Sequence, residues 1–245
     1  MANSNGNKIA LVTGATRGIG FETVRQLASQ GVHVLLAGRD RGKAVDAALK
    51  LQSEGLPVEA IALDVTSDSS IAAAAEEVAA KHGRLDILVN NAGVFRDDGT
   101  LKPSQQSLDV WLGTFNTNLF GLIATTQAFL PLLHKSPGAR IVNVSSILGS
   151  IALHQDPASP IYNYKVPAYN VSKTAVNAWT AHLAYELRET PHKVNTIHPG
   201  SVLTDMNAQG DLSVEDGART SVRLALIDEA GPNGGYFHFE ETLPW

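Results

Sequence analysis

The sequence contains no cysteine among its 245 residues. Disulfide bonds, thiolate nucleophiles and cysteine-ligated metals are therefore excluded, and no particular redox compartment is required. The eight histidines form no H-x-x-x-H or H-E pair, which are the local patterns typical of a metal-binding helix. We therefore expect no metal site.

Long hydrophobic runs are missing as well. No segment approaches the roughly 18 consecutive apolar residues of a membrane span, and the polar stretch 1–8 lacks the apolar core of a signal peptide. The net charge of −5 and the pI near 5.9 give the chain no general attraction for nucleic acid. These absences predict a cytoplasmic protein whose partners are neither membranes nor nucleic acids.

The sequence does contain a repeated alternation of short apolar runs and helical patterns. Hydrophobic residues make up 44% and charged residues 18% of the chain, which is enough for a packed core. We predict strands at 9–12, 32–37, 58–63, 85–89, 139–144, 193–197 and 235–239, and helices at 19–30, 43–53, 69–82, 108–133, 171–189 and 214–227. Short apolar strands without strict alternation are typical of parallel sheets that are covered on both faces. The pattern predicts one α/β domain over 1–245, a Rossmann-type doubly wound parallel sheet of about seven strands with helices on both faces.

A glycine-rich loop joins the first predicted strand to the first predicted helix. Its sequence is Thr13-Gly14-Ala15-Thr16-Arg17-Gly18-Ile19-Gly20. Glycines with this spacing let the backbone turn tightly and approach a pyrophosphate, and the helix start offers unpaired N–H groups to it. Because the loop lies between a strand and a helix, it predicts a dinucleotide site.

The end of the second predicted strand bears on which dinucleotide is bound. An acidic residue there would bind the 2′-hydroxyl of the adenosine ribose, but this strand ends in Gly38, followed by Arg39. Arg17 in the glycine loop supplies a second guanidinium, and arginine suits a 2′-phosphate because its planar fork donates two hydrogen bonds. We predict NADPH/NADP+. Asp40 keeps NAD(H) open, because a shift of one residue would place its carboxylate on the ribose.

A tyrosine and a lysine with helical spacing follow in the second half of the chain. Tyr169 and Lys173 stand four residues apart and share one face of a predicted helix. A nearby cation stabilises phenolate and lowers the pKa of a tyrosine, which prepares it for proton exchange. Tyr162 and Tyr164 are rival tyrosines, but neither has a lysine four residues later.

Taken together, these motifs resemble the short-chain dehydrogenase/reductase family. The matching segments are the T-G-x-x-x-G-x-G loop at 13–20, N-N-A-G at 90–93, the helix asparagine Asn118, Ser146 in V-N-V-S-S, Tyr169 and Lys173 in Y-x-x-x-K, and Pro199-Gly200 followed by Thr204. They occur in the family's order over about 190 residues. The segments 212–218 and 231–235 and the pair Arg17 and Arg39 are most similar to the NADPH-dependent carbonyl reductase branch.

The resemblance implies a role for each site residue. Tyr169 would give a proton to the carbonyl oxygen, Lys173 would lower the tyrosine pKa and hold the nicotinamide ribose, Ser146 would bond the carbonyl oxygen, and Asn118 would anchor a water. Cofactor contacts are implied for Gly14, Thr16, Arg17, Gly18, Ile19, Gly20, Arg39, Asp64, Val65, Asn91, Ala92, Gly93, Tyr169, Lys173, Pro199, Gly200, Val202 and Thr204. The cofactor half would then span about 1–145 and the catalytic and substrate half about 146–245. Asn90 is expected to tie strands together instead.

Two segments depart from the usual family pattern. The gap between Ser146 and Tyr169 is long, and the extra segment 150–167 contains three prolines, so we expect a structured loop over the pocket mouth. Only a short stretch separates Thr204 from the helix predicted at 214, so we expect a small lid and an open pocket.

The predicted activity is NADPH-dependent reduction of a hydrophobic or aromatic ketone or aldehyde. One alternative is an NAD(P)-dependent alcohol dehydrogenase that works in the oxidative direction. Another is a dinucleotide-sensing protein without turnover, although such proteins usually lose the tyrosine or the lysine. A homo-oligomer formed through the long helices and a monomer both remain open.

Overall fold

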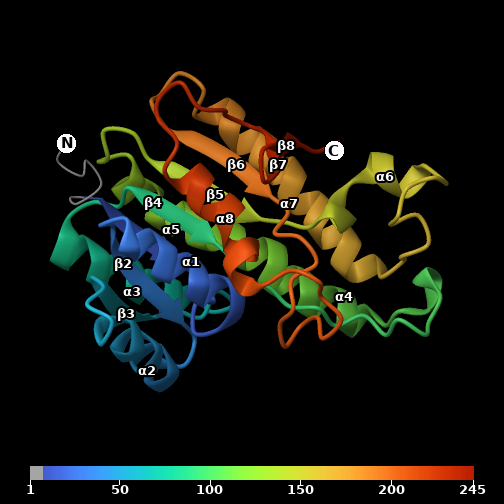
Figure 1. The fold of residues 1–245 in the computed structure, drawn as a ribbon, viewed down its shortest axis with the longest axis horizontal. Helices are drawn as coiled ribbons and strands as arrows, with labels where there is room; N and C mark the ends of the chain where they lie inside the picture. Colours follow the sequence, from blue (N-terminus) through green and yellow to red (C-terminus); the bar gives the residue numbers. More distant parts are fainter. Residues whose placement is uncertain (1–7) are drawn as a thin grey trace.

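The fold is an eight-stranded sheet with helices on both faces, seen in Figure 1. The computed structural model describes residues 8–245; residues 1–7, part of the stretch in which we expect no signal peptide, lie outside the described residues. The strands are β1 (Ile9–Val12), β2 (His33–Gly38), β3 (Val58–Ala62), β4 (Ile87–Asn90), β5 (Arg140–Val144), β6 (Lys193–Ile197), β7 (Tyr236–His238) and β8 (Glu241–Thr242). Their order is β3-β2-β1-β4-β5-β6-β7-β8, and all neighbours are parallel except β7 and β8.

Alternating strand residues feed two separate cores, one on each face of the sheet. Ala10 and Val12 of β1 pack into one core, and Leu11 between them packs into the other, as the two-residue period of a strand requires. The first core is closed by α1 (Gly18–Ser29), α2 (Arg41–Gln52) and α8 (Val214–Ala225). The second is closed by α3 (Asp68–His82), α5 (Gly121–Leu133) and α7 (Pro167–Glu186). The predicted doubly wound architecture is confirmed.

The long helix predicted over 108–133 is interrupted. The structure has α4 (Leu108–Phe115), a π-helical turn over Asn116–Phe120 and then α5. Residues in a π-turn are displaced from the regular helical face, and such turns are frequent at functional sites. Just after the turn the helix comes so close to the loop that follows β3 that a Cβ on Gly121 would lie 2.5 Å from the Val65 carbonyl oxygen. Periodicity alone does not reveal this interruption.

The segment 150–167 is not the continuous loop that we expected. Ser150 caps a short helix, α6 (Ile151–Gln155), by accepting a hydrogen bond from the Leu153 N–H. A turn-rich stretch then leads to α7, which begins at Pro167, four residues earlier than predicted. Proline is favoured in the first turn of a helix because its missing N–H would have no partner there. Tyr169 therefore lies in the first turn of α7.

Candidate active site

The glycine loop lies between β1 and α1, at the carboxyl end of β1. Gly14 and Gly18 have φ of 62° and 56°, the left-handed region that glycine adopts most easily. At Gly14 a Cβ would also lie 2.8 Å from the Ala92 Cα, so only glycine fits. Arg17 occupies the N-cap position of α1 without a side-chain capping bond, which leaves the start of the helix open to an anion.

Asn90 and Asn91 are neighbours in the sequence, but their side chains form hydrogen bonds with different parts of the fold. Asn90 donates to the Thr126 hydroxyl and to the Asn143 side chain, so its expected role in tying strands together is confirmed. Asn91 donates from Nδ2 to the carbonyls of Thr13 and Gly14 at 2.9 and 3.1 Å. Asn91 thereby holds the glycine loop against the end of β4.

The end of β2 has no room for an acidic side chain. A Cβ on Gly38 would lie 2.4 Å from the Thr16 Cγ2. Arg39 is exposed beside it. The Asp40 carboxylate accepts a hydrogen bond from the Lys43 N–H and caps α2. Asp40 therefore already has a structural task at this position.

Arg17, which we expect to bind the cofactor phosphate, forms an ion pair within the protein. Its Nη1 lies 2.5 Å from the Asp205 carboxylate, and both side chains are mostly exposed. An ion pair between exposed side chains contributes little stability, so Arg17 can exchange Asp205 for another anion at small cost. Asp64 is likewise engaged, because its carboxylate accepts from the Thr66 N–H and hydroxyl. Val65 beside it is buried.

The predicted catalytic residues meet at the carboxyl end of β5. Ser146 comes two residues after the end of this strand, and its side chain lies close enough to Tyr169 to affect the pKa of the phenol. The Lys173 Nζ lies 5.6 Å from the centre of the Tyr169 ring and donates to the Val144 carbonyl at 2.9 Å. A Cβ on Gly93 would lie 3.6 Å from the same Nζ, so the end of β4 also reaches this cluster.

Asn118 joins the cluster from the π-turn. Its Oδ1 accepts from the Val94 N–H at 2.8 Å, and its Nδ2 donates to the Val94 carbonyl and to the Ser172 hydroxyl. Ser172 in turn donates to the Tyr169 carbonyl. Asn118 thus links the turn after β4 to the first turn of α7, and a second lone pair on Oδ1 is available to a water.

Burial dominates the pKa values of two residues in this cluster. Burial raises the pKa of Tyr169 to about 12, because the effect of burial exceeds that of the hydrogen bond from Ser146. Burial also lowers the pKa of Lys173 to about 8. Lys173 is not among the causes of the Tyr169 shift, so a lowering of the tyrosine pKa by Lys173 stays a prediction. At neutral pH the Tyr169 phenol carries its proton.

Two supporting residues were not predicted from the sequence. Both carboxylate oxygens of Asp97 accept from α7, from the N–H groups of Ala168 and Tyr169 at 2.8 and 2.9 Å. The fully buried Tyr236 donates from its hydroxyl to the Ser146 carbonyl at 2.5 Å. Each contact joins residues at least 71 positions apart in the sequence, so no local sequence motif predicts the roles of Asp97 and Tyr236.

The stretch after β6 lies against the glycine loop. Gly200, after Pro199, has a φ of 96°, and Val202 forms a parallel bridge with Leu212. A Cβ on Gly18 would lie 3.7 Å from the Thr204 Cγ2. The short segment thus folds back on itself and brings Thr204 to the expected cofactor side.

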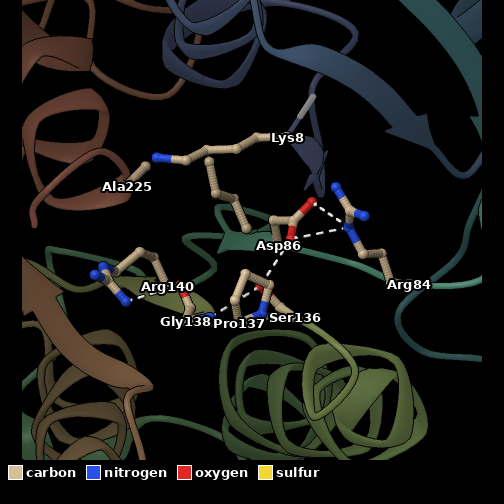
Figure 2. Close-up of a pocket in the computed structure, with 9 residues that line it drawn as sticks. Lys8, Arg84, Asp86, Ser136, Pro137, Gly138, Arg140 and Ala225 are labelled. Carbon is tan, nitrogen blue, oxygen red and sulfur yellow. Dashed lines mark hydrogen bonds and ion pairs between the residues drawn. The ribbon is translucent and has the colours of Figure 1, made fainter. Parts of the chain in front are cut away.

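A cavity of about 440 Å³ lies beside the catalytic cluster. Phe95 lines it, and its ring centre is 5.2 Å from that of Tyr169. The other lining residues are Gly99, Leu101, Pro103, Asn163, Tyr164, Lys165 and Val166, so segment 150–167 does contribute a wall. A second pocket, shown in Figure 2, contains Asp86 and Arg140 at the amino ends of the strands, away from this cluster.

Known proteins resemble this chain over almost its whole length. A family model described as short chain dehydrogenase matches residues 8–213. A (+)-neomenthol dehydrogenase of Arabidopsis thaliana is 34% identical, with 94% of this chain and 95% of the relative covered. The structure of salutaridine reductase from Papaver somniferum has a TM-score of 0.81 and 31% identity, covering 94% of this chain and 99% of that one. A short chain dehydrogenase from Shigella flexneri complexed with NADP has a TM-score of 0.83 and 29% identity, covering 97% and 98%.

Proposed function

The chain belongs to the short-chain dehydrogenase family, and we propose that it reduces a ketone or aldehyde to an alcohol with NADPH. The observation that carries this proposal is the meeting of Ser146, Tyr169 and Lys173 beside the glycine loop. A hydroxyl, a phenol and an ammonium in one partly enclosed cluster are the donors that a carbonyl oxygen needs as it becomes negatively charged.

The choice of NADPH rests on the end of β2. Gly38 leaves no room for the acid that would repel a 2′-phosphate, because Thr16 fills the space. Asp40 is engaged as the cap of α2, while Arg39 is exposed. The uncapped N-terminus of α1 fits the pyrophosphate. The Shigella relative was solved with NADP, which agrees with this choice.

When bound, NADPH supplies the hydride, and the protein supplies the proton. Tyr169 would donate its phenolic proton to the substrate oxygen, which it can do because burial keeps it protonated at neutral pH. Ser146 would donate a hydrogen bond to the same oxygen. Lys173 and Asn118 would lead a replacement proton to the phenolate. Both side chains border Gly93, where a Cβ would lie 3.6 Å from the Lys173 Nζ and 3.5 Å from the Asn118 Oδ1.

The protonated phenol favours reduction over the reverse reaction. Oxidation of an alcohol requires the deprotonated phenolate, which a pKa of about 12 leaves scarcely populated at neutral pH. The relatives include both a dehydrogenase and a reductase by name, so their names do not favour either direction. The cavity beside Phe95 suits a hydrophobic or aromatic substrate, because Leu101, Tyr164 and Val166 also line it.

The test is a screen for NADPH oxidation over ketones, aldehydes and 1,2-diketones, repeated with NADH. We expect turnover with at least one bulky or aromatic carbonyl compound and a clear preference for NADPH. NADPH binding without turnover of any carbonyl or alcohol would instead indicate a dinucleotide-sensing protein. Faster oxidation of alcohols with NAD+ would indicate an alcohol dehydrogenase.

A further inference from the structure

Three side chains with metal-binding atoms converge at the outer edge of the sheet, on the strands' amino-terminal side. His33 begins β2, Glu59 is the second residue of β3, and His82 ends α3. Figure 1 shows β2, β3 and α3 close together in the blue-to-teal part of the chain. One ligand atom from each residue lies within 4.8 Å of the other two. The cluster lies away from the catalytic residues, which follow the carboxyl ends of the strands.

Glu59 contacts both histidines at ion-pair distances. The Glu59 Oε2 lies 3.6 Å from the His33 Nε2 and 3.4 Å from the His82 Nε2. Both Nε2 atoms are buried without a hydrogen-bond partner among residues 8–245. A buried nitrogen without a partner costs free energy, so a ligand for the pair would stabilise the fold.

The same distances fit a tetrahedral metal ion. Zinc binds imidazole nitrogen and carboxylate oxygen at about 2.0–2.2 Å, which puts neighbouring donor atoms of a tetrahedron roughly 3.3 Å apart. The two distances to Glu59 already approach this value. The ligand nitrogens of the two imidazoles lie within 4.8 Å of each other, so they would have to approach by at most about 1.5 Å to reach the tetrahedral separation. A zinc ion between the three atoms would need only small side-chain shifts.

Lys81 orients the carboxylate for this geometry. Its Nζ contacts the Glu59 Oε1 and also lies 2.8 Å from Glu77, so the second oxygen, Oε2, turns towards the histidines. Metal-binding carboxylates are commonly held by such an outer partner. Lys81 is therefore a positioning residue. Its ammonium forms ion pairs with both Glu59 and Glu77.

We propose that His33, Glu59 and His82 form a zinc site that joins β2, β3 and α3, with the fourth position open to water. Imidazole with carboxylate is a ligand set that suits zinc. Since the ligands come from three elements, zinc would bind the folded chain far better than the unfolded one and would raise its melting temperature. Because His33, Glu59 and His82 are 26 and 23 residues apart in the sequence, a local spacing motif does not reveal the site.

The experiment is a calorimetric titration of the full chain with zinc chloride, together with melting curves. We expect one zinc per chain and a higher melting temperature. His33→Gln and His82→Gln should each weaken binding at least about tenfold, while the exposed His182→Gln is the matched control and should bind as the wild type does. NADPH binding by each variant checks that it is folded.

A second measurement needs no substitution. Cobalt(II) bound at a four-coordinate nitrogen and oxygen site gives intense visible absorption, which zinc should remove by displacement at one equivalent. Zinc uptake that is unchanged in both histidine variants, binding spread over several weak sites, or a cobalt spectrum like that of the hydrated ion would each overturn the proposal. In those cases the three side chains form only ordinary ion pairs when the histidines are protonated.

Discussion

At the scale of single residues, the site depends on what burial does to two ionisable groups. Burial disfavours charge, so it raises the pKa of Tyr169 and lowers that of Lys173. At neutral pH, Tyr169 is therefore a protonated phenol, and Lys173 is a cation whose pKa is only slightly above the pH. This arrangement suits proton transfer to a substrate, and the negative charge of a bound cofactor would hold Lys173 in its protonated form.

The cofactor preference is testable at Arg39. Arg39→Gln should raise the KM for NADPH far more than the KM for NADH, because only NADPH offers a 2′-phosphate to the guanidinium. A hydrogen bond to a charged group contributes about 1.5–3 kcal/mol. Steady-state kinetics with both cofactors gives the measurement, and Arg188→Gln, whose guanidinium stacks on Tyr185, is the control. Equal weakening of both cofactors would contradict the assignment.

His198 gives a prediction for pH. Burial lowers its pKa to about 3, with a smaller contribution from His238. Below pH 6.5 the unfolded chain binds a proton that the folded chain does not, so stability rises with pH in this range and is lost as pH falls from 6.5 towards 3. The loss from this residue approaches about 1.4 kcal/mol per pH unit.

The measurement compares urea unfolding of the wild type and His198→Asn between pH 7 and pH 4.5. The asparagine oxygen can replace the Nδ1 that accepts from the Gly200 N–H. We expect the stability of the variant to depend less on pH, so that the difference between the two proteins changes as pH falls. Parallel curves would show that His198 does not titrate as its burial implies.

At the scale of elements, the position of Tyr169 depends on how α7 begins. The N-cap residue Val166 makes no capping bond with its side chain. The Asp97 carboxylate caps the helix instead. It accepts two hydrogen bonds from the first turn of α7 and places a negative charge at the positive end of the helix dipole. The loop after β4 thereby fixes the backbone of the proposed proton donor.

Asp97→Ala should therefore reduce both stability and turnover. Loss of a helix cap costs about 1–2 kcal/mol, and a displaced Tyr169 should lower kcat while the KM for NADPH stays nearly unchanged. The stability and kcat of Asp97→Asn should lie between those of the wild type and Asp97→Ala, because asparagine keeps one acceptor oxygen. The control is Asp98→Ala, whose carboxylate bonds Thr100 within its own loop. An unchanged kcat in a destabilised Asp97→Ala would limit Asp97 to a structural role.

Some helices and strands could be predicted from the sequence, and others could not. Apolar runs predict β1 and β6 with their observed bounds because buried parallel strands have a local signature. The π-turn at Asn118 and the helix at 151–155 have no such signature. The turn is followed by a close approach of Gly121 to Val65, and a single serine caps the helix. Asp97 and Tyr236 act across long separations in the sequence, which only the folded chain reveals.

At the scale of the whole molecule, the sheet brings together segments that the sequence separates. The ends of β1, β4 and β5 carry the glycine loop, Asn91 and Ser146, and parallel order puts these ends at one edge. The family motifs could therefore be joined into one predicted site before the structure was known. No helix among residues 8–245 is both long and apolar enough to cross a membrane. The Arabidopsis alignment runs over 285 positions, more than this chain has, so that relative carries inserted residues and its substrate need not be shared.

The most direct test of the account is hydride transfer by Tyr169→Phe, measured in single turnovers with bound NADPH and a ketone from the screen. Phenylalanine keeps the ring and its packing against Phe95 but removes the proton. We predict a loss of at least about 10²-fold in rate with NADPH affinity retained, because the glycine loop and Arg39 are proposed to bind the other half of the cofactor. Tyr185→Phe, at an exposed position, should transfer hydride at the wild-type rate. A Tyr169→Phe variant that reduces the ketone nearly as fast as the wild type would contradict the proposed mechanism.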